Sequence, residues 1–431
     1  MEKYQLAYGS GHIDITLPAA GKVQLVEGRP TPPVTDVAAA VREALAAPIG
    51  TPPLKDVFAA GDNVAIVASD LTRGWLRHDQ FLPVLLDELN AAGVVDKDIT
   101  LVVALGAHRR HTAAENAAVY GEAVVRRIRI EQSYAEDEVD FVNLGTTSRG
   151  VPVNINRHVM AADKVLLTGG IVYHPMAGFA GGRKGLIPGV ASYATIQANH
   201  RYCLAAAVGE GISPTAGCGS LAGNHMHEDQ MEIAAMVNPA FLFNVILSPD
   251  GGFARFVAGH WQKAWEAGCR LVADIYGVAI GEKTDLVIAS AGGYPKDMNF
   301  YQASKATENA LAACKDDGAL IALLECRDIG DPPDFSGWFD IPSLYERELA
   351  LRQRFTVPGY VALKVGLEAR RTPHIIVTLP ENKAFFDKVG MTAVTTFAEA
   401  LALAEQKLGR SGYSVTVLPH AANTAPLLAA T

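Results

Sequence analysis

The segment "NVAIVASDLTR" (residues 63–73) joins an unbroken apolar run to aspartate, threonine and arginine, and this pattern recurs along the chain. Later segments of the same form are "ITLVVALGAHRRH" (99–111), "KVLLTGGIVYHP" (164–175), "TDLVIASAGGYPKD" (284–297) and "GALIALLECRDIG" (318–330). Continuous apolar strands alternating with amphipathic helices, such as "HDQFLPVLLDELNAAG" (78–93), are typical of parallel sheets covered on both faces. We therefore predict an α/β fold with mainly parallel sheets. Ligands bind such sheets at the carboxyl ends of the strands.

The predicted strands fall into two series, separated by the helical pattern "GHWQKAWEAGCRLVADIYG" (259–277). We predict an N-terminal α/β domain over residues 1–268, a helical linker over 269–284 and a C-terminal α/β domain over 285–431. Within the second series, "ATENALAACKDDG" (306–318) and "TTFAEALALAEQKLG" (395–409) predict amphipathic helices that end in glycine. The segment "YSVTVLPHA" (413–421) predicts the final strand.

Composition narrows the class of protein and its partners. The chain has 431 residues, of which 49% are hydrophobic and 19% charged, so it can bury large cores. A formal charge of -9 argues against general affinity for nucleic acid or membranes. No apolar run is long enough to cross a bilayer, and we expect a cytoplasmic protein. The five cysteines show no C-x-x-C spacing, so we expect buried thiols without disulfides or a zinc knuckle.

The positive charge is concentrated in glycine-punctuated stretches, as a cleft for a small anion would need. The residues concerned are Arg73, Arg77, Arg109, Arg110, Arg183, Lys184 and Arg201. One of these stretches, residues 173–201, contains "GFAGGRKG" but lacks the spacing and the Ser or Thr of a P-loop. Gly181 and Gly182 could still let backbone amides approach an anion, with Arg183 adding charge. Lys184 is either a solvent-facing lysine or the covalent attachment point of a cofactor.

Three histidines are candidates for chemistry. His108 and His174 each follow a predicted strand and a turn of small residues. If the two strand ends are neighbours, the histidines could flank one substrate as acid and base from opposite sides. His200 ends a short helical pattern that Ser192 could cap, and imidazole is a suitable ligand for nickel, copper or zinc. The residues alone also fit a structural role for each histidine.

Four motifs in order resemble the nickel-dependent lactate racemase family. They are "DLTR" (70–73), "GAHR" (106–109), "HPMAGFAGGRKGLIPGVAS" (174–192) with His200 downstream, and "GGYPKDMNFYQASKA" (292–306). The resemblance extends over roughly residues 10–420. It implies a racemase or epimerase of 2-hydroxy acids with two α/β domains and an interdomain active-site cleft. It also implies a nickel-pincer nucleotide, a pyridinium-3-thioamide-5-thiocarboxylic acid mononucleotide that carries nickel, and proteins that build this cofactor and insert its metal.

The resemblance also assigns roles to residues. Lys184 would carry the covalent link to the cofactor and His200 would be the protein ligand of nickel. Asp70, Thr72 and the backbone of Gly181, Gly182 and Arg183 would help to seat the nucleotide. His108 and His174 would be the paired acid and base during hydride transfer through a planar 2-keto acid. Arg73 would bind the substrate carboxylate, and Tyr301, Gln302 and Lys305 would complete the pocket.

The sequence departs from the family pattern at two positions beside the pocket. Ala107 stands where the family usually has threonine, and Gly74 stands where it usually has proline. Together with the neighbours Trp75, Arg110 and His111, these departures bear on which hydroxy acid is turned over. Two alternatives remain open: a pyridoxal phosphate enzyme with Lys184 as the Schiff base, or a non-catalytic protein that binds an anion or a metal.

Overall fold

The computed structural model describes residues 2–17, 21–249 and 251–428, and the chain divides into two compact units. The central unit comprises Pro30–Leu204 and Ser213–Ala273; the terminal unit comprises Met1–Arg29, Ala205–Ile212 and Asp274–Thr431. The main division thus lies near residue 274, inside α9 (Lys263–Tyr276). Unlike the division expected from the sequence, this one assigns the first 29 residues to the same unit as the last strands.

The central unit is built on a mainly parallel sheet. Its described residues form a six-stranded sheet in the order β14-β13-β9-β4-β5-β6, in which only β13 and β14 pair antiparallel. Its strands are β4 (Val64–Ser69), β5 (Ile99–Gly106), β6 (Arg129–Tyr134), β9 (Lys164–Gly170), β13 (Phe241–Leu247) and β14 (Phe253–Gly259). The segments 63–73, 99–111 and 164–175 therefore begin with adjacent parallel strands, with β4 between β5 and β9. Their carboxyl ends meet at one edge of the sheet.

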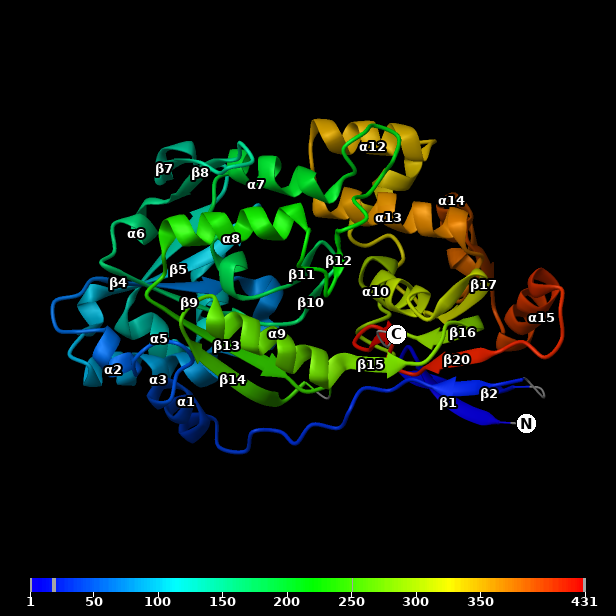
Figure 1. The fold of residues 1–431 in the computed structure, drawn as a ribbon, viewed down its shortest axis with the longest axis horizontal. Coiled ribbons are helices and arrows are strands. Elements are labelled where there is room, and N and C mark those ends of the chain that lie inside the picture. Colours follow the sequence, from blue (N-terminus) through cyan, green and yellow to red (C-terminus); the bar gives the residue numbers. More distant parts are fainter. Residues whose placement is uncertain (1, 18–20, 250, 429–431) are drawn as a thin grey trace. The chain divides into compact units, whose positions relative to one another are not determined.

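Helices cover both faces of the central sheet. One face packs Ile66, Ala68 and Leu166 against α1 and α3, which lie below the sheet in Figure 1. On the opposite face, Val67 and Leu167 contact the 3-10 turn η4, where a Cβ on Gly185 would lie 3.4 Å from Val67. The helices are α1 (Val37–Ala46), α2 (Leu54–Val57), α3 (His78–Ala91), α4 (Ala113–Tyr120), α5 (Glu122–Arg127), α6 (Arg157–Met160), α7 (Tyr193–His200) and α8 (His225–Val237).

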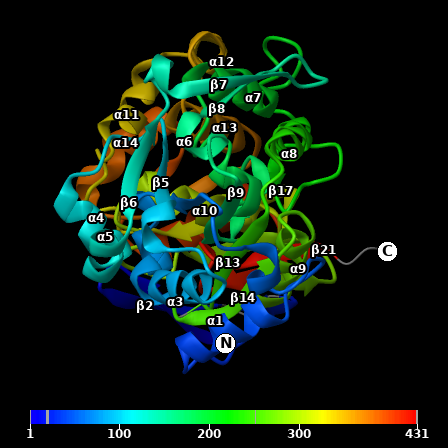
Figure 2. The same cartoon turned by 90° about the vertical axis from the view of Figure 1, so that its left-hand side faces the viewer.

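Short elements connect the sheet to the loops that follow its strands. Figure 2 shows the side of the central unit that carries β5, β6, α4 and α5. The 3-10 turns are η1 (Leu71–Leu76), η2 (Asp96–Asp98), η3 (Glu138–Asp140), η4 (Gly182–Gly185) and η5 (Arg201–Cys203). The small strands are β7 (Phe141–Thr146), β8 (Pro152–Asn156), β10 (Tyr173–His174), β11 (Ala177–Phe179) and β12 (Gly217–Cys218).

The terminal unit has a second parallel sheet. Among its described residues, six strands follow the order β19-β18-β17-β16-β20-β3, with parallel pairing throughout. The strands are β3 (Val23–Leu25), β16 (Thr284–Ser290), β17 (Cys314–Leu323), β18 (His374–Val377), β19 (Thr392–Val394) and β20 (Val415–Leu418). Because Val23 pairs with Val415, the start of the chain belongs to this sheet.

Alternating side chains of this sheet contribute to two cores. Val287, Leu320 and Ile376 face the core that includes α10 and α13, whereas Leu286 and Ile321 face the core that includes α15 and the β1–β2 hairpin. The helices and turns are α10 (Phe300–Leu311), α11 (Pro333–Ser336), η6 (Gly337–Asp340), α12 (Leu344–Gln353), α13 (Val357–Arg371), η7 (Pro380–Asn382), α14 (Lys383–Val389) and α15 (Phe397–Leu408). The remaining strands are β1 (Lys3–Tyr8), β2 (Gly11–Thr16), β15 (Gly277–Ile280) and β21 (Ala425–Leu428).

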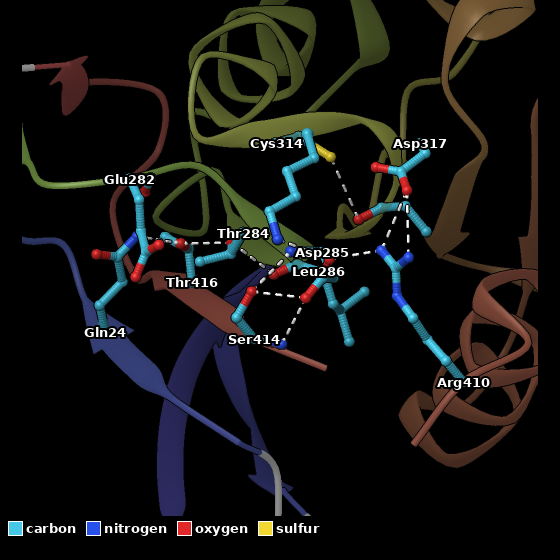
Figure 3. Close-up of polar contacts among 12 residues, drawn as sticks. Gln24, Glu282, Thr284, Asp285, Leu286, Cys314, Asp317, Arg410, Ser414 and Thr416 are labelled. Carbon is cyan, nitrogen blue, oxygen red and sulfur yellow. Dashed lines mark hydrogen bonds and ion pairs between the residues drawn. The ribbon is translucent and has the colours of Figure 1, made fainter. Parts of the chain in front are cut away.

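A buried carboxylate ties together the amino ends of three strands in this sheet. Asp285 accepts hydrogen bonds from the Ser414 amide at 2.8 Å and the Ser414 hydroxyl at 2.7 Å, and pairs with Lys315 at 2.9 Å and Arg410 at 2.5 Å (Figure 3). Burial raises the pKa of Asp285, but the bonds from Ser414 and Lys315 outweigh it and hold that pKa below its usual value. We call these four residues the Asp285 cluster.

Two sequence-based predictions for the terminal unit are wrong. The helix predicted over 306–318 ends at Leu311, and β17 begins at Cys314 because Cys314 pairs with Thr284. The segment 413–421 holds β20, but it is not the final strand, since β21 follows and pairs with β15. In both cases the deciding contact comes from a strand remote in sequence.

Other expectations from the sequence are confirmed. The helix predicted over 395–409 is α15, and Gly409 ends it in the left-handed conformation with φ 62°. Cys203, Cys269, Cys314 and Cys326 are buried thiols, and Cys218 is partly exposed. Within the described ranges, no helix combines the length and the hydrophobicity that crossing a bilayer requires.

Candidate active site

A pocket in the central unit brings the predicted strand-end residues together. It opens where β4, β5 and β9 end and is lined further by η1 and η4. Among its lining residues are Asp70, Thr72, Arg73, His108, His174, Gly181 and Lys184. The predicted gathering of strand-end groups therefore holds for the central unit.

His108 and Asp70 form a short hydrogen-bonded pair at the wall of this pocket. The Nδ1 atom of His108 lies 2.5 Å from Oδ2 of Asp70, whose other oxygen accepts a 2.6 Å bond from the Thr72 hydroxyl. Burial raises the pKa of Asp70, but the bonds from His108 and Thr72 and the charge of Arg73 lower it on balance. An ionised carboxylate can only accept, so Nδ1 of His108 carries a proton, and in the neutral ring the lone pair lies on Nε2.

His174 has the opposite tautomer. The amides of Met176 and Ala177 both donate to its Nδ1 atom, each at 3.2 Å, so the proton of the neutral ring lies on Nε2. Burial lowers the pKa of His174 well below its usual value, and the charges of Lys184 and Arg73 lower it further. His174 lies on β10, four residues beyond β9, and β4 separates β9 from β5. The sequence suggested that the two histidines follow neighbouring strands. They do not, because β4 lies between β5 and β9, but both line one pocket.

Lys184 is partly buried, and its amine lies in a positively charged surrounding. It lies on η4, which Gly181 begins with φ 71°, and it lines the pocket. Burial, followed by the charges of Arg183 and Arg73, lowers the pKa of Lys184 to about 7. A substantial fraction of the amine is therefore unprotonated at neutral pH, which is the nucleophilic form.

His200 ends α7, and its ring is oriented by the helix itself. Ser192 caps α7 by accepting from the Thr195 amide, as the sequence predicted. Nδ1 of His200 lies 3.0 Å from the carbonyl oxygen of Ile196, which requires a proton on Nδ1 and leaves the ring lone pair on Nε2. Burial and the charge of Lys184 lower the pKa of His200 to about 3, so the ring is neutral. A neutral imidazole with this tautomer suits a metal at Nε2.

The glycine-rich turn before Lys184 is occupied by internal contacts. The Gly182 amide donates to Oδ1 of Asn244 at 2.8 Å, and a Cβ at Gly182 would lie 2.6 Å from the Trp265 ring. The Arg183 side chain donates at 2.7 Å to the carbonyls of Phe179 and Ala177 and stacks 4.0 Å from the Trp265 ring centroid. Arg183 therefore points into the protein. Of Gly181, Gly182 and Arg183, only Gly181 lines the pocket.

Other predicted residues lie outside this pocket. Tyr301, Gln302 and Lys305 occupy the first turns of α10 in the terminal unit, where Lys305 donates to Gln302 at 2.9 Å. Arg109 pairs with Glu115 at 2.6 Å and Arg110 pairs with Asp137, so neither recharges the pocket. Ala107 is exposed and does not line it, and a Cβ at Gly74 would meet open space. Trp75 does line the pocket, with 42% of its surface exposed.

Sequence reasoning missed the floor of the pocket. Thr168, Gly169 and Gly170 at the end of β9 line it, and a Cβ at Gly170 would lie 2.1 Å from Leu76. The only sequence signal was the "TGG" that follows the apolar run of residues 165–167. Small residues at this strand end let η1 approach the sheet and so bring Asp70 and Arg73 to the pocket.

Comparisons with known proteins agree on one family. The "Lactate racemase N-terminal domain" family matches residues 8–211, and the "Lactate racemase C-terminal domain" family matches residues 280–424. A lactate racemase from Thermoanaerobacterium thermosaccharolyticum is 33% identical over 385 residues, which cover 88% of each chain. A lactate racemase from Lactiplantibacillus plantarum is 36% identical over 289 residues, covering 67% of this chain and 66% of that protein.

Solved structures show the same similarity. The lactate racemase apoprotein from Thermoanaerobacterium thermosaccharolyticum matches with a TM-score of 0.86 and 29% identity, over 99% of this chain and 100% of that one. A Thermotoga maritima protein shares the fold, with a TM-score of 0.59 and 14% identity over 91% of this chain and 97% of that one.

Proposed function

The chain belongs to the lactate racemase family and is an isomerase, and on that premise we propose that it inverts the C2 centre of lactate or a closely related 2-hydroxy acid. The observation that carries the proposal is the pair of oppositely tautomerised histidines in one pocket with an activated lysine. His108 presents an acceptor at Nε2 and His174 presents a donor at Nε2. Inversion needs this complementarity, because a proton must leave the hydroxyl on one side and be supplied on the other.

The residues present fit a nickel-pincer nucleotide. Lys184 has the lowered pKa that a covalent attachment point needs, and Nε2 of the neutral His200 would ligate the nickel. Within the described residues, no group of three or more His, Cys, Asp or Glu side chains could hold a metal. We therefore assign the other donors to the cofactor's sulfur and carbon atoms. When bound, this cofactor supplies a hydride acceptor, which avoids deprotonation of a carbon next to a carboxylate.

The pocket's own residues would bind and orient the substrate. Arg73 is exposed and lines the pocket, where its guanidinium can pair with the substrate carboxylate. His108 would take the hydroxyl proton of the first enantiomer at Nε2, because Asp70 holds its other nitrogen. His174 would face the hydroxyl of the opposite enantiomer. By the family resemblance, Tyr301, Gln302 and Lys305 of α10 would also take part in binding the substrate.

Binding would also prepare His174 for its part in proton transfer. The charges of Lys184 and Arg73 are two of the causes that depress its pKa. Covalent attachment at Lys184 would remove the first charge, and a bound carboxylate would offset the second. The part of the pKa depression of His174 that these two charges cause should therefore diminish on loading, whereas the larger part, caused by burial, remains.

The direct test is racemisation by loaded protein. Protein made with its nickel and cofactor-building machinery should interconvert D- and L-lactate, measured by chiral chromatography, and mass spectrometry should find a nucleotide-sized adduct on the Lys184 peptide. Lys184→Ala protein made in the same way should lack both. An adduct without racemisation of any 2-hydroxy acid in a chiral panel would refute the proposed activity.

Measurements on the same protein distinguish the two alternatives. A pyridoxal phosphate enzyme would show an imine absorbance and trap on Lys184 with borohydride, without nickel. A binding protein would retain ligand and metal but racemise nothing. We further propose that the chain acts in the cytosol and receives its cofactor from dedicated biosynthesis and nickel-insertion proteins.

A further inference from the structure

Three residues after His108 comes another histidine, His111, which does not line the pocket. His111 is buried, with 8% of its surface exposed. The Leu71 amide donates to its Nε2 atom at 2.9 Å, and its Nδ1 atom lies 3.0 Å from Oδ1 of Asn116. These partners specify one tautomer, with the proton on Nδ1 and the lone pair directed at Leu71.

Hydrogen bonds fix the backbone of His111 as well as its ring. Its amide donates to Oε1 of Gln132 at 2.7 Å, and its carbonyl accepts from Nε2 of the same side chain at 3.0 Å. Gln132 lies on β6, beside β5 in the sheet. The position of His111 is therefore set by the sheet and not by the exposed loop of Arg109 and Arg110.

The peptide groups on both sides of Asp70 are held from this direction. Leu71 donates its amide to His111, and Ser69 gives its carbonyl to the Tyr120 hydroxyl at 2.9 Å. The rings of His111 and Tyr120 stack with their centroids 6.3 Å apart and an angle of 29° between their planes. Asp70 thus emerges from a backbone fixed at both neighbours, and its carboxylate meets His108 at 2.5 Å.

We propose that His111 is a positioning residue: by accepting the Leu71 amide it fixes the peptide that carries Asp70, so that Asp70 holds His108 with its lone pair on Nε2. His111 touches neither substrate nor cofactor in this scheme. Its catalytic consequence rests on the proposed function, whereas its effect on the His108 tautomer does not.

A bond between His108 and Asp70 tolerates little displacement, because a hydrogen bond weakens steeply once its distance or angle departs from the optimum. Without an acceptor at position 111, the part-buried Leu71 amide must turn towards another partner, which rotates the adjoining Asp70 peptide. His108 would then populate both neutral tautomers, and only one of them presents a base to the pocket.

The first test needs no cofactor. In the unloaded protein, nitrogen-15 NMR of labelled histidines should show His108 as the Nδ1–H tautomer. His111→Leu should convert it to a mixture of tautomers, and His111→Gln, which restores an acceptor, should return most of the wild-type signal. His260→Leu is the matched control: this histidine also accepts a backbone amide, that of Gln262 at 3.2 Å, but lies outside the pocket.

The second test uses loaded enzyme. His111→Leu should lower kcat about 10-fold with KM within about twofold, and His111→Gln should recover most of the loss, as for other residues that orient a catalytic ligand. Thermal unfolding identifies any variant that fails to fold. An unchanged His108 tautomer in folded His111→Leu would overturn the proposal, whatever the activity. If the tautomer shifts while wild-type protein racemises no hydroxy acid, the positioning role stands and the proposed function fails.

Discussion

The pocket at the carboxyl ends of β4, β5 and β9 and the Asp285 cluster at the amino ends of β16, β17 and β20 hold buried charge in opposite ways. In the cluster, each oxygen of Asp285 meets donors within its own unit, including Lys315 and Arg410. In the pocket, Asp70 is matched by His108, but burial and neighbouring positive charge lower the pKa of Lys184. The same causes lower the pKa of His200, which does not line the pocket.

The difference separates a structural site from a binding site. A buried charge that finds its partners within the chain stabilises the fold, whereas an excess of one sign costs stability until a ligand compensates it. An uncompensated charge that lowers the stability of the fold is typical of functional sites. The comparison therefore predicts opposite outcomes for substitutions in the two regions.

The largest expected effect is on catalysis at the pocket. His108→Asn and His174→Asn should each lower kcat of the loaded enzyme by about 10²–10⁴-fold, because each removes one proton-transfer group. Neither should lower the midpoint of thermal unfolding appreciably, since both rings border a solvent-accessible pocket. A large loss of stability with normal activity per folded molecule would reverse the assignment of this region.

The next effect is on stability at the cluster. Asp285→Asn should lower the free energy of unfolding by about 2 kcal/mol, because it removes the charge-assisted bonds that join three strands. Denaturant titration measures this directly. The folded pKa of Asp285 lies below its unfolded value, so its contribution is present above about pH 4 and is lost as the pH falls through the folded pKa. The difference between wild type and variant should therefore shrink in acid, while kcat stays unchanged at neutral pH.

Much of both regions could be predicted from the sequence, and the reasons differ. The strands were predictable because runs such as 64–68 and 286–289 are continuously apolar, and the polar residues that follow them mark the strand ends. Asp285 gave no comparable signal. Its partners Lys315, Arg410 and Ser414 are far along the chain, and only the pairing of β16 with β17 and β20 brings them together.

At the pocket, the local sequence pattern predicts which residues take part but not their tautomers or orientations. Lys184 and the two histidines were identifiable by residue type and position, but the opposite tautomers of His108 and His174 depend on Asp70 and on two backbone amides. The sequence indicated the charge of Arg183 but not the orientation of its side chain, because its stacking on Trp265 involves a residue 82 positions away. The same limit applies to β3, whose partner β20 lies near the other end of the chain.

A further effect tests the cost of the pocket's positive charge. Lys184→Met should raise the free energy of unfolding of the unloaded protein at pH 7, since it removes a partly buried amine whose charged form is disfavoured. The folded pKa is about 7, below the unfolded value of 10.5, so the wild-type contribution rises with pH between these values. The variant should lack that rise, and its advantage should vanish by about pH 11. Equal stabilities at pH 7 would show that the amine is well solvated.

The smallest effect concerns the anion that the pocket charge should attract. Lactate should raise the unfolding midpoint of the unloaded protein more than chloride does at equal ionic strength, with a gain of about 0.4 kcal/mol when its concentration equals its dissociation constant. Arg73→Met should abolish this difference, because Arg73 is the guanidinium that lines the pocket among the described residues. Arg410→Met, in the Asp285 cluster, should lower stability equally in both salts. If lactate stabilised the Arg73 variant as well as wild type, its binding would not depend on this arginine, and the contrast between the two regions would lose its electrostatic basis.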